Sequence, residues 1–400
     1  MKKAWLSAIC LAAAPLVAHA QWGLAHLHDF TGTDGAWTTA PSTLMKAADG
    51  NYYGVTYQGG TNGKGVMYKM VITGTQVSPS TTYTVLHNFY DGTVTNDGAF
   101  PTGAMVQDAS GSFYGVAYGG GAASVGMIFR YNPTTGYTVM HSFNDGTTSQ
   151  DGQRPSAGLT IDASGNIYGI TTSGGSHGFG TIFKLSQSGG IWTYSIIYNF
   201  VGSLSCGSPD GTLTLGLDGN LYGVSSGAIC AFQFNPSTHA FVKIGAPVGD
   251  PGYNGLIENP NSYASGIREF FGTTALSGAN SKGTIYKFTE TAHNSNVFTY
   301  SLVHTFAGGS LDGNAPYGNL LWSTDNGGSF YGTTYSGGGS NAGMLFNITT
   351  GGTFSSMRDL TGNPREGVIW GNIGGTSVLI GTSRFGGASN YGFVWEAYII

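Results

Sequence analysis

Short runs of alternating hydrophobic and polar residues recur along the chain, and Gly, Asp, Asn or Pro separates each run from the next. The clearest set has one run that ends at Phe143, a second over 158–161, a third around Tyr168 and a fourth over 180–185. Each run is about five to seven residues long and rich in β-branched and aromatic residues, which is typical of strands joined by turns. No stretch of residues 21–400 shows a convincing helical period, so the pattern predicts an all-β protein.

An aromatic-glycine step occurs once in every set of four runs and defines a repeat. The glycines of successive steps are 61, 54, 54, 49, 60 and 49 residues apart. The steps are Tyr53-Gly54, Tyr114-Gly115, Tyr168-Gly169, Tyr222-Gly223, Phe271-Gly272, Tyr331-Gly332 and the degenerate Ile380-Gly381. Seven units of four short strands predict a seven-bladed β-propeller with four-stranded antiparallel blades, formed as a single domain by residues 21–400.

The two ends of the chain predict how this ring closes. A lone outer-type strand at 24–30 opens the first repeat, and the last repeat ends with a third-type strand at 391–398. We expect the N-terminal strand to complete the seventh blade, so that no sheet edge is left unpaired between them. The glycine of each step is expected to let inner strands of neighbouring blades approach closely, while the adjacent aromatic ring fills the wider gap.

Composition narrows the functional classes. Glycine makes up 68 of the 400 residues, charged residues only 9% and aromatic residues 13%. A disordered chain needs more charge and fewer aromatics, and collagen needs glycine at every third position, so both classes are excluded. The chain has only 15 Lys and Arg residues, no basic run and a formal charge of -5, which argues against a nucleic-acid partner.

The N-terminal segment predicts export. Two lysines precede an apolar run over 4–18, which is shorter than the roughly 20 residues of a membrane-spanning helix. Small residues at Ala18 and Ala20 suit a signal peptidase, so residues 1–20 are expected to be a signal peptide that is cleaved before Gln21. The mature chain is then secreted to the cell exterior or the periplasm, without a transmembrane segment.

Two cysteines, Cys206 and Cys230, remain after cleavage. An even pair in an oxidising compartment predicts one structural disulfide, which would close a loop of about 24 residues. Two unpaired buried thiols are the alternative. Both cysteines belong to the fourth repeat, which lacks the Gly-Gly step of the others, and the cross-link is expected to substitute for the order that those glycines provide.

The repeat joins an Asp-Gly step and a proline to Gly-Asn before Tyr-Gly, a Gly-Gly step and a final Gly-x-(Ile/Val)-Phe-Lys run. With these motifs the mature chain resembles the GloVer (Gloeo/Verruco) tandem repeat of secreted bacterial proteins over essentially its whole length. The resemblance implies no particular chemistry, because the family is defined by its repeat and by varied surface anchors. Members often carry a C-terminal sorting segment; since none is recognisable before Ile400, release is expected rather than anchoring.

Aspartate and histidine recur at equivalent positions of the repeats. They are Asp34, Asp97, Asp151, Asp210 and Asp312 in the loops, and His28, His87, His141 and His304 at the ends of outer runs. Calcium binding is one interpretation of the aspartates, but one carboxylate per loop falls short of the about six to eight oxygens that Ca²⁺ takes, and Asp-Gly is a common turn. Equivalent histidines on separate blades splay apart, which favours a structural role over a metal site. We therefore expect no metal and no cofactor.

Charged residues that interrupt the repeat are better candidates for function. Those near loops that enter or leave the inner strands, on the predicted binding face, are Arg154, Arg365, Glu366 and Arg384. Arg268 and Glu269 replace a turn of the fifth repeat and are expected on the opposite face. Because Glu366 is the only glutamate placed near the axial entrance, no catalytic residue is assigned.

These features favour a secreted, non-catalytic binding or scaffold propeller. We expect a monomer that contacts an extracellular glycan or a surface protein through loop aromatics, Asn, Asp and Gly. An extracellular polysaccharide hydrolase or lyase is the alternative. Two carboxylates within about 6 to 10 Å at the axial entrance would favour catalysis, whereas an entrance that is empty or lined by Ser and Gly would favour binding.

Overall fold

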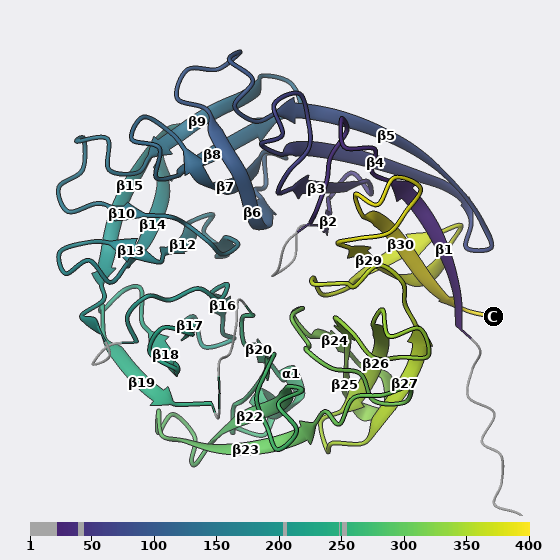
Figure 1. Cartoon of the computed structure of the whole chain (residues 1–400). Coiled ribbons are helices and arrows are strands. Elements are labelled where there is room, and N and C mark those ends of the chain that lie inside the picture. The colour runs from purple at the N-terminus through teal and green to yellow at the C-terminus, as the bar shows by residue number, and fades with distance from the viewer. Residues whose placement is uncertain (1–21, 39–43, 203–205, 248, 250–253) are drawn as a thin grey trace, which may run out of the picture.

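Seven four-stranded antiparallel sheets stand around a central axis as the blades of a β-propeller, which confirms the predicted fold (Figure 1). The computed structural model describes residues 22–38, 44–202, 206–247, 249 and 254–400. The predicted signal segment at 1–20 and the cleavage position before Gln21 lie outside these residues.

Each blade runs outward from the axis, and its four strands are named from innermost to outermost. Strands at the same distance from the axis come from the same position of the sequence repeat. The innermost strands are β2 (Leu44–Lys46), β6 (Gly98–Gln107), β11 (Thr160–Ile161), β16 (Thr214–Leu215), β20 (Ile257–Glu258), β24 (Leu321–Ser323) and β28 (Ile369–Ile373). The second strands are β3 (Tyr52–Thr56), β7 (Phe113–Gly120), β12 (Ile167–Thr171), β17 (Leu221–Ser225), β21 (Glu269–Thr274), β25 (Ser329–Thr334) and β29 (Thr376–Ser383). The third strands are β4 (Val66–Thr75), β8 (Met127–Asn132), β14 (Thr181–Ser188), β18 (Cys230–Phe234), β22 (Thr284–Glu290), β26 (Met344–Thr349) and β30 (Phe393–Ile399). The outermost strands are β5 (Ser78–Asn88), β9 (Gly136–Ser142), β15 (Ile191–Asn199), β19 (Phe241–Gly245), β23 (Phe298–Thr305), β27 (Phe354–Asp359) and β1 (Trp22–Asp29).

Few elements depart from this plan. In blade 3, β10 (Gly152–Gln153) and β13 (Ser173–Gly174) form a separate two-stranded ladder between loops. Blade 5 connects its first two strands through a short helix, α1 (Pro260–Ala264), which the sequence pattern did not predict because so short a helix has no detectable period. A 3₁₀ turn, η2 (Asp325–Gly327), lies at the same place in blade 6. No helix in the described part of the chain is long and apolar enough to span a membrane.

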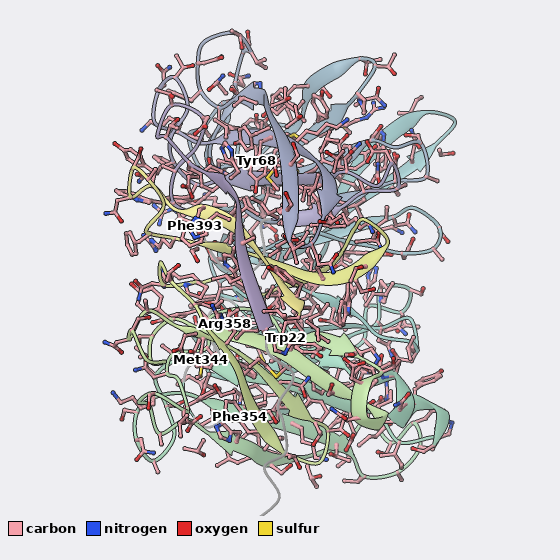
Figure 2. All side chains as sticks on the ribbon, turned by 90° about the vertical axis from the view of Figure 1, so that its right-hand side faces the viewer. Trp22, Tyr68, Met344, Phe354, Arg358 and Phe393 are labelled. Atoms are coloured by element: carbon pink, nitrogen blue, oxygen red, sulfur yellow. A yellow bond between two sulfur atoms is a disulfide. The ribbon has the colours of Figure 1, made fainter. Side chains whose placement is uncertain are left out.

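The ring closes between the two ends of the chain, as predicted. β1 pairs antiparallel with β30 of blade 7, from Trp22 opposite Ile399 to Asp29 opposite Phe393. Figure 2 shows this closure from the rim, with Trp22 and Phe393 labelled. Because β1 then leads into blade 1, the first and last blades are tied together by backbone hydrogen bonds as well as by side-chain packing.

The glycine of the aromatic-glycine step has a different role from the one predicted. In blade 3, Gly169 lies directly opposite Phe183 of the third strand, and a Cβ on Gly169 would overlap the Phe183 ring. In the other blades the partners of the glycine are Tyr68, Phe129, Phe232, Tyr286, Phe346 and Trp395. The glycine therefore makes room for an aromatic ring of its own blade, and does not serve the close approach of neighbouring blades.

Buried hydrophobic clusters fill the gaps between neighbouring blades. Each of the seven blade boundaries has its own cluster. Between blades 2 and 3, for example, Phe143, Leu159 and Phe183 are all almost completely buried. The core is thus distributed around the ring, and the loops at its two ends are left for other roles.

The loops that enter the innermost strands and the loops that leave the second strands lie on one face, which we call the entry face. In blade 3 the amide of Gly175 donates a hydrogen bond to the carbonyl of Asp151, at 2.8 Å. Gly174 has a φ of 78°, and a Cβ on it would meet the backbone at Asp151. The recurring Gly-Gly step is therefore needed to pack one loop of the entry face against the other.

Candidate functional site

The recurring histidines and aspartates lie at separate positions of the sequence repeat, but in the structure they meet in pairs between blades. Nε2 of His141, on outermost strand β9, lies 2.8 Å from Oδ2 of Asp151 in the entry loop of the next blade. The same pairing, which we call a latch, joins His28 to Asp34, His87 to Asp97 and His304 to Asp312, at 3.1, 3.0 and 2.8 Å. Each latch therefore ties one blade to the next.

An aromatic ring of the following blade completes each latch. The Tyr194 ring stacks on the His141 ring at 3.7 Å, and its hydroxyl donates to Oδ1 of Asp151 at 2.7 Å. The amide of Asn144 donates to the same carboxylate at 2.8 Å. Burial tends to raise the pKa of Asp151, but the hydrogen bonds from His141, Tyr194 and the Asn144 amide outweigh it and hold the pKa below its usual value. Because the carboxylate is satisfied by the protein itself, the structural interpretation of these residues is preferred to a metal site.

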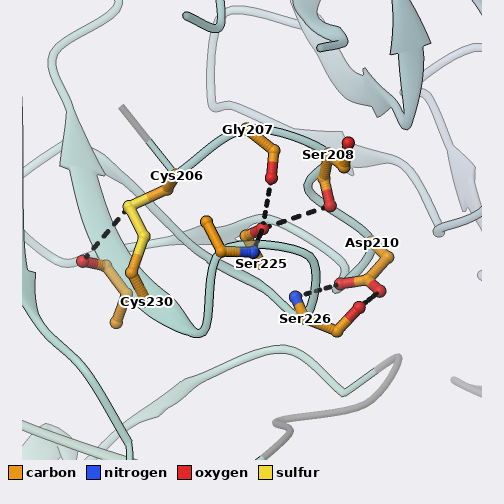
Figure 3. The surroundings of a disulfide bond; sticks show 9 residues. Cys206, Gly207, Ser208, Asp210, Ser225, Ser226 and Cys230 are labelled. Carbon is orange, nitrogen blue, oxygen red and sulfur yellow. Dashed lines mark hydrogen bonds between the residues drawn. A yellow bond between two sulfur atoms is a disulfide. The ribbon is translucent and has the colours of Figure 1, made fainter. Parts of the chain in front are cut away.

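Blade 4 contains a cross-link of another kind, within a single blade. The predicted disulfide joins Cys206 in the entry loop to Cys230 at the start of β18 (Figure 3). Next to it, the amide of Ser226 donates to Oδ1 of Asp210 at 3.0 Å, and the Ser226 hydroxyl contacts Oδ2. The aspartate thus holds the exit loop at the place where the Gly-Gly step is missing.

Arg268 and Glu269 lie at the end of the blades opposite the entry face, as predicted. Arg268 is buried, and its guanidinium donates to Glu290 at 2.8 and 2.9 Å and also contacts Asp218. Glu269 accepts from Lys287 at 2.7 Å. Both charges are thus paired with described residues, and the Arg268 cluster joins the neighbouring blades 4 and 5.

Six side chains from blades 6, 7 and 1 converge on the entry face beside the innermost strands, and we call them the axial cluster. They are Tyr317 and Tyr335 of blade 6, Arg365, Glu366 and Arg384 of blade 7, and Tyr57 of blade 1. The hydroxyl of Thr333 holds the backbone carbonyl of Glu366 at 2.7 Å. The side-chain amide of Asn363 donates to the carbonyl of Tyr335 at 3.0 Å, so blades 6 and 7 are bonded directly beneath the cluster.

Glu366 is the buried member of the axial cluster. It is 1% exposed, and neither carboxyl oxygen has a hydrogen-bond partner among the described residues. Burial raises its pKa to about 8, although the nearby Thr38 hydroxyl and the charges of Arg365 and Arg384 favour the ionised form. The carboxyl is therefore mostly neutral at pH 7 and can donate a hydrogen bond as well as accept one.

Arg365 and Arg384 flank this carboxyl without an ion pair. The Arg365 guanidinium carbon lies 4.5 Å from the centroid of the Tyr317 ring and 6.0 Å from that of Tyr335. The Arg384 carbon lies 5.5 Å from the ring of Phe385, and burial together with Arg365 lowers the pKa of Arg384. Within the described chain Nε of both arginines is buried without a hydrogen-bond partner. Two like charges thus lie near each other, and each contacts aromatic rings.

The structure brings three of the four predicted residues together. Arg154, the fourth, lies apart on the same face, with its guanidinium carbon 6.0 Å from the ring of Tyr118. A similar pair is formed by Lys64, whose Nζ lies 4.6 Å from the ring of Phe100. Three places on the entry face therefore combine a cation with an aromatic ring.

The tyrosines of the axial cluster were missed by the sequence analysis. A signal for them exists, because the residue three positions after the glycine of each step is the most variable of an otherwise regular strand. Around the ring this position is held by Tyr57, Tyr118, Thr172, Ser226, Ala275, Tyr335 and Arg384. Variation at a position whose neighbours are repeated marks the place where structure does not dictate the residue.

Solved structures with a similar fold have different roles. A streptogramin B lyase matches with a TM-score of 0.55 and 12% identity, over 95% of this chain and 98% of that one. A virginiamycin B lyase from Staphylococcus aureus matches with a TM-score of 0.56 and 11% identity, over 95% and 100%. The extracellular domain of a protein described as a hybrid two-component system from B. thetaiotaomicron gives 0.58 and 12%, over 95% and 43%. At these identities the likeness shows the fold alone. No curated protein matches the sequence.

A family model identifies the repeat directly. The model described as Gloeobacter/Verrucomicrobia repeat matches residues 17–149 and 74–244, which together make up more than half of the chain. Blades 5 to 7 continue the same four-stranded plan beyond the matched residues. The chain belongs to the Gloeobacter/Verrucomicrobia repeat family.

Proposed function

We propose that this protein is a secreted, non-catalytic binding propeller that takes up an extracellular glycan on its entry face. Secretion is supported by the family and by the Cys206–Cys230 disulfide, which is stable in an oxidising compartment. Binding through the entry face follows the general use of loops on a rigid scaffold.

One observation carries the proposal: the entry face holds a set of aromatic residues that are only half-buried. They are Trp37, Tyr57, Phe100, Tyr118, Tyr317, Tyr335 and Phe385. In contrast, the aromatic rings opposite the step glycines are almost completely buried and belong to the core. Half-buried rings offer a flat apolar surface to the C–H face of a sugar, and tyrosine hydroxyls add hydrogen bonds.

Binding is preferred to catalysis because Glu366 has no second carboxylate or histidine beside it in the described part of the axial cluster. Acid-base cleavage of a glycosidic bond uses two carboxyl groups about 5 to 10 Å apart. One buried carboxyl near two arginines instead suits recognition, since in its neutral form it can donate a hydrogen bond to a ligand oxygen.

A glycan array probed with the purified protein tests the proposal. We expect specific spots that disappear with Tyr335→Ala and persist with Tyr263→Ala, a matched change of an exposed tyrosine on α1 at the opposite face. An array without specific spots, or equal losses in the two variants, would overturn binding at the entry face. Release of shortened sugars from a bound glycan would overturn the non-catalytic assignment.

A further inference from the structure

Three arginines of the entry face carry a charge that no described carboxylate pairs. The chain has six arginines and a formal charge of -5. Arg154, Arg365 and Arg384 all lie on the entry face, and none of them forms an ion pair with a described residue. Arg268, by contrast, is paired with Asp218 of blade 4 and Glu290 of blade 5. Three of the six arginines thus lie on the entry face without an ion pair among the described residues and could serve a partner of opposite charge.

The axial cluster is also electrostatically incomplete. Arg365 and Arg384 are near enough for each to affect the other, and the carboxyl between them is mostly neutral at pH 7, so it does not cancel their charge. Nε of each arginine is buried without a hydrogen-bond partner among the described residues, and so are both carboxyl oxygens of Glu366, which is unfavourable. An anionic group held by both arginines, with Glu366 donating to it from below, would satisfy all three side chains.

We propose that the axial cluster binds an acidic glycan, with the carboxylate or sulfate group of one sugar between Arg365 and Arg384 and the sugar ring on the neighbouring tyrosines. The inference rests on the proposed function and names its ligand class. Lys64 with Phe100 and Arg154 with Tyr118 repeat the combination of a cation and an aromatic ring on the same face. A polymer with a negative charge on each repeating sugar fits such a spaced set better than a ligand with a single charge.

Titration calorimetry with four polymers separates the sources of this charge. The probes are polygalacturonate for carboxylate, dextran sulfate for sulfate, dextran as the neutral polysaccharide and polyglutamate as an acidic polymer without sugars. We expect one or both acidic polysaccharides to bind, with affinity that falls as salt rises, and dextran and polyglutamate to bind at least tenfold more weakly. Dextran binding as tightly as the acidic polysaccharides would overturn the inference and leave the proposed function standing. Binding of polyglutamate alone, or of no polymer, would overturn both.

Matched variants locate the site. Arg365→Gln and Arg384→Gln should each lower the affinity for the acidic polysaccharide at least tenfold, while Arg358→Gln, which removes the same charge from the exposed side of outermost strand β27, should leave it within twofold (Figure 2). Thermal unfolding of each variant confirms that it is folded. Equal effects of Arg358→Gln and Arg365→Gln would show attraction by overall charge and would contradict a site at the axial cluster.

Discussion

Two buried carboxyl groups in equivalent entry loops have opposite surroundings. Asp151 in blade 3 accepts hydrogen bonds from His141, Tyr194 and two backbone amides, and its pKa lies below the usual value. Glu366 in blade 7 accepts none from the described residues, and burial raises its pKa to about 8. The first group is a repeated structural element, whereas the second interrupts the repeat at a place where the protein leaves polar groups unsatisfied. The difference separates side chains that hold the ring together from those available to a ligand.

Removal of the structural carboxylate of Asp151 has the largest expected effect on stability. Asp151→Ala leaves His141, the Tyr194 hydroxyl and two amides without their acceptor, so we expect a loss of about 3 to 5 kcal/mol in the free energy of unfolding. Urea unfolding at pH 7 measures it. Asp145→Ala, which removes an exposed turn aspartate of the same loop, is the control and should cost less than about 1 kcal/mol. Equal costs would contradict the structural role of the latch.

The disulfide of blade 4 is a second structural element whose contribution to stability can be measured. Replacing both Cys206 and Cys230 with serine opens a loop with a sequence separation of 24 residues and should cost about 3 kcal/mol in the chain-entropy account. Urea unfolding of the double variant measures the cost, with the single variants as controls for the change of side chain. A loss below about 1 kcal/mol would mean that Asp210 and Ser226 order this loop without the disulfide.

Glu366→Gln tests the other side of the comparison through its pH dependence. The pKa of Glu366 is raised in the folded state, so the wild-type protein loses stability as pH rises from the ordinary value of 4.5 through about 8, where the unfolded chain binds fewer protons than the folded one. The glutamine variant lacks this loss, and its stability relative to wild type should rise by on the order of 2 kcal/mol between pH 6 and pH 9. Unfolding curves at several pH values give the difference. A constant difference would show that Glu366 titrates normally.

Asp151 should show the opposite dependence. Its folded pKa is depressed, so the stability that it contributes is present above the ordinary value of 3.8 and is lost as pH falls through the folded pKa. The gap between wild type and Asp151→Asn should therefore close in acid and remain open at neutral pH.

The smallest expected effect comes from Tyr194→Phe. The change removes one hydrogen bond to Asp151 but keeps the ring stacked on His141, and blade 6 already has this form, with Phe354 on His304 at 4.3 Å. We expect a loss of about 1 kcal/mol, measured by thermal unfolding. A loss as large as that of Asp151→Ala would mean that the Tyr194 hydroxyl, and not the contact between His141 and Asp151, dominates the latch.

The sequence predicts the fold well because the features that determine it are local in the chain and recur in every repeat. Strand length, turn residues and the period of the Tyr-Gly step lead to seven blades, and the unmatched strand at the N-terminus leads to the closure. The latches could not be predicted, since His141 and Asp151 meet through the packing of two blades, and neither residue type alone indicates its partner. The role of Gly169 was assigned wrongly for the same reason: its contact is with Phe183 on another strand.

The candidate site was found only in part. Arg365, Glu366 and Arg384 were visible as charges in a chain with few charges, but the tyrosines around them look like ordinary strand residues in the sequence. That Tyr335 and Tyr57 approach Arg384 depends on the angle between three blades, which no spacing along the chain reveals.

Replacing the two arginines and the buried carboxyl of the axial cluster tests most directly whether these residues serve a ligand or the fold. The variant Arg365→Gln, Glu366→Gln and Arg384→Gln should be as stable as the wild type at pH 7, or more stable. It replaces two partly buried guanidinium charges and a buried carboxyl, which lack partners among the described residues, with neutral amides. Urea unfolding of the free protein measures the change in the free energy of unfolding, and the ligand need not be known. A loss of about 3 kcal/mol or more, like that expected for Asp151→Ala, would show that the cluster holds blades 6, 7 and 1 together and would contradict its assignment as a binding site.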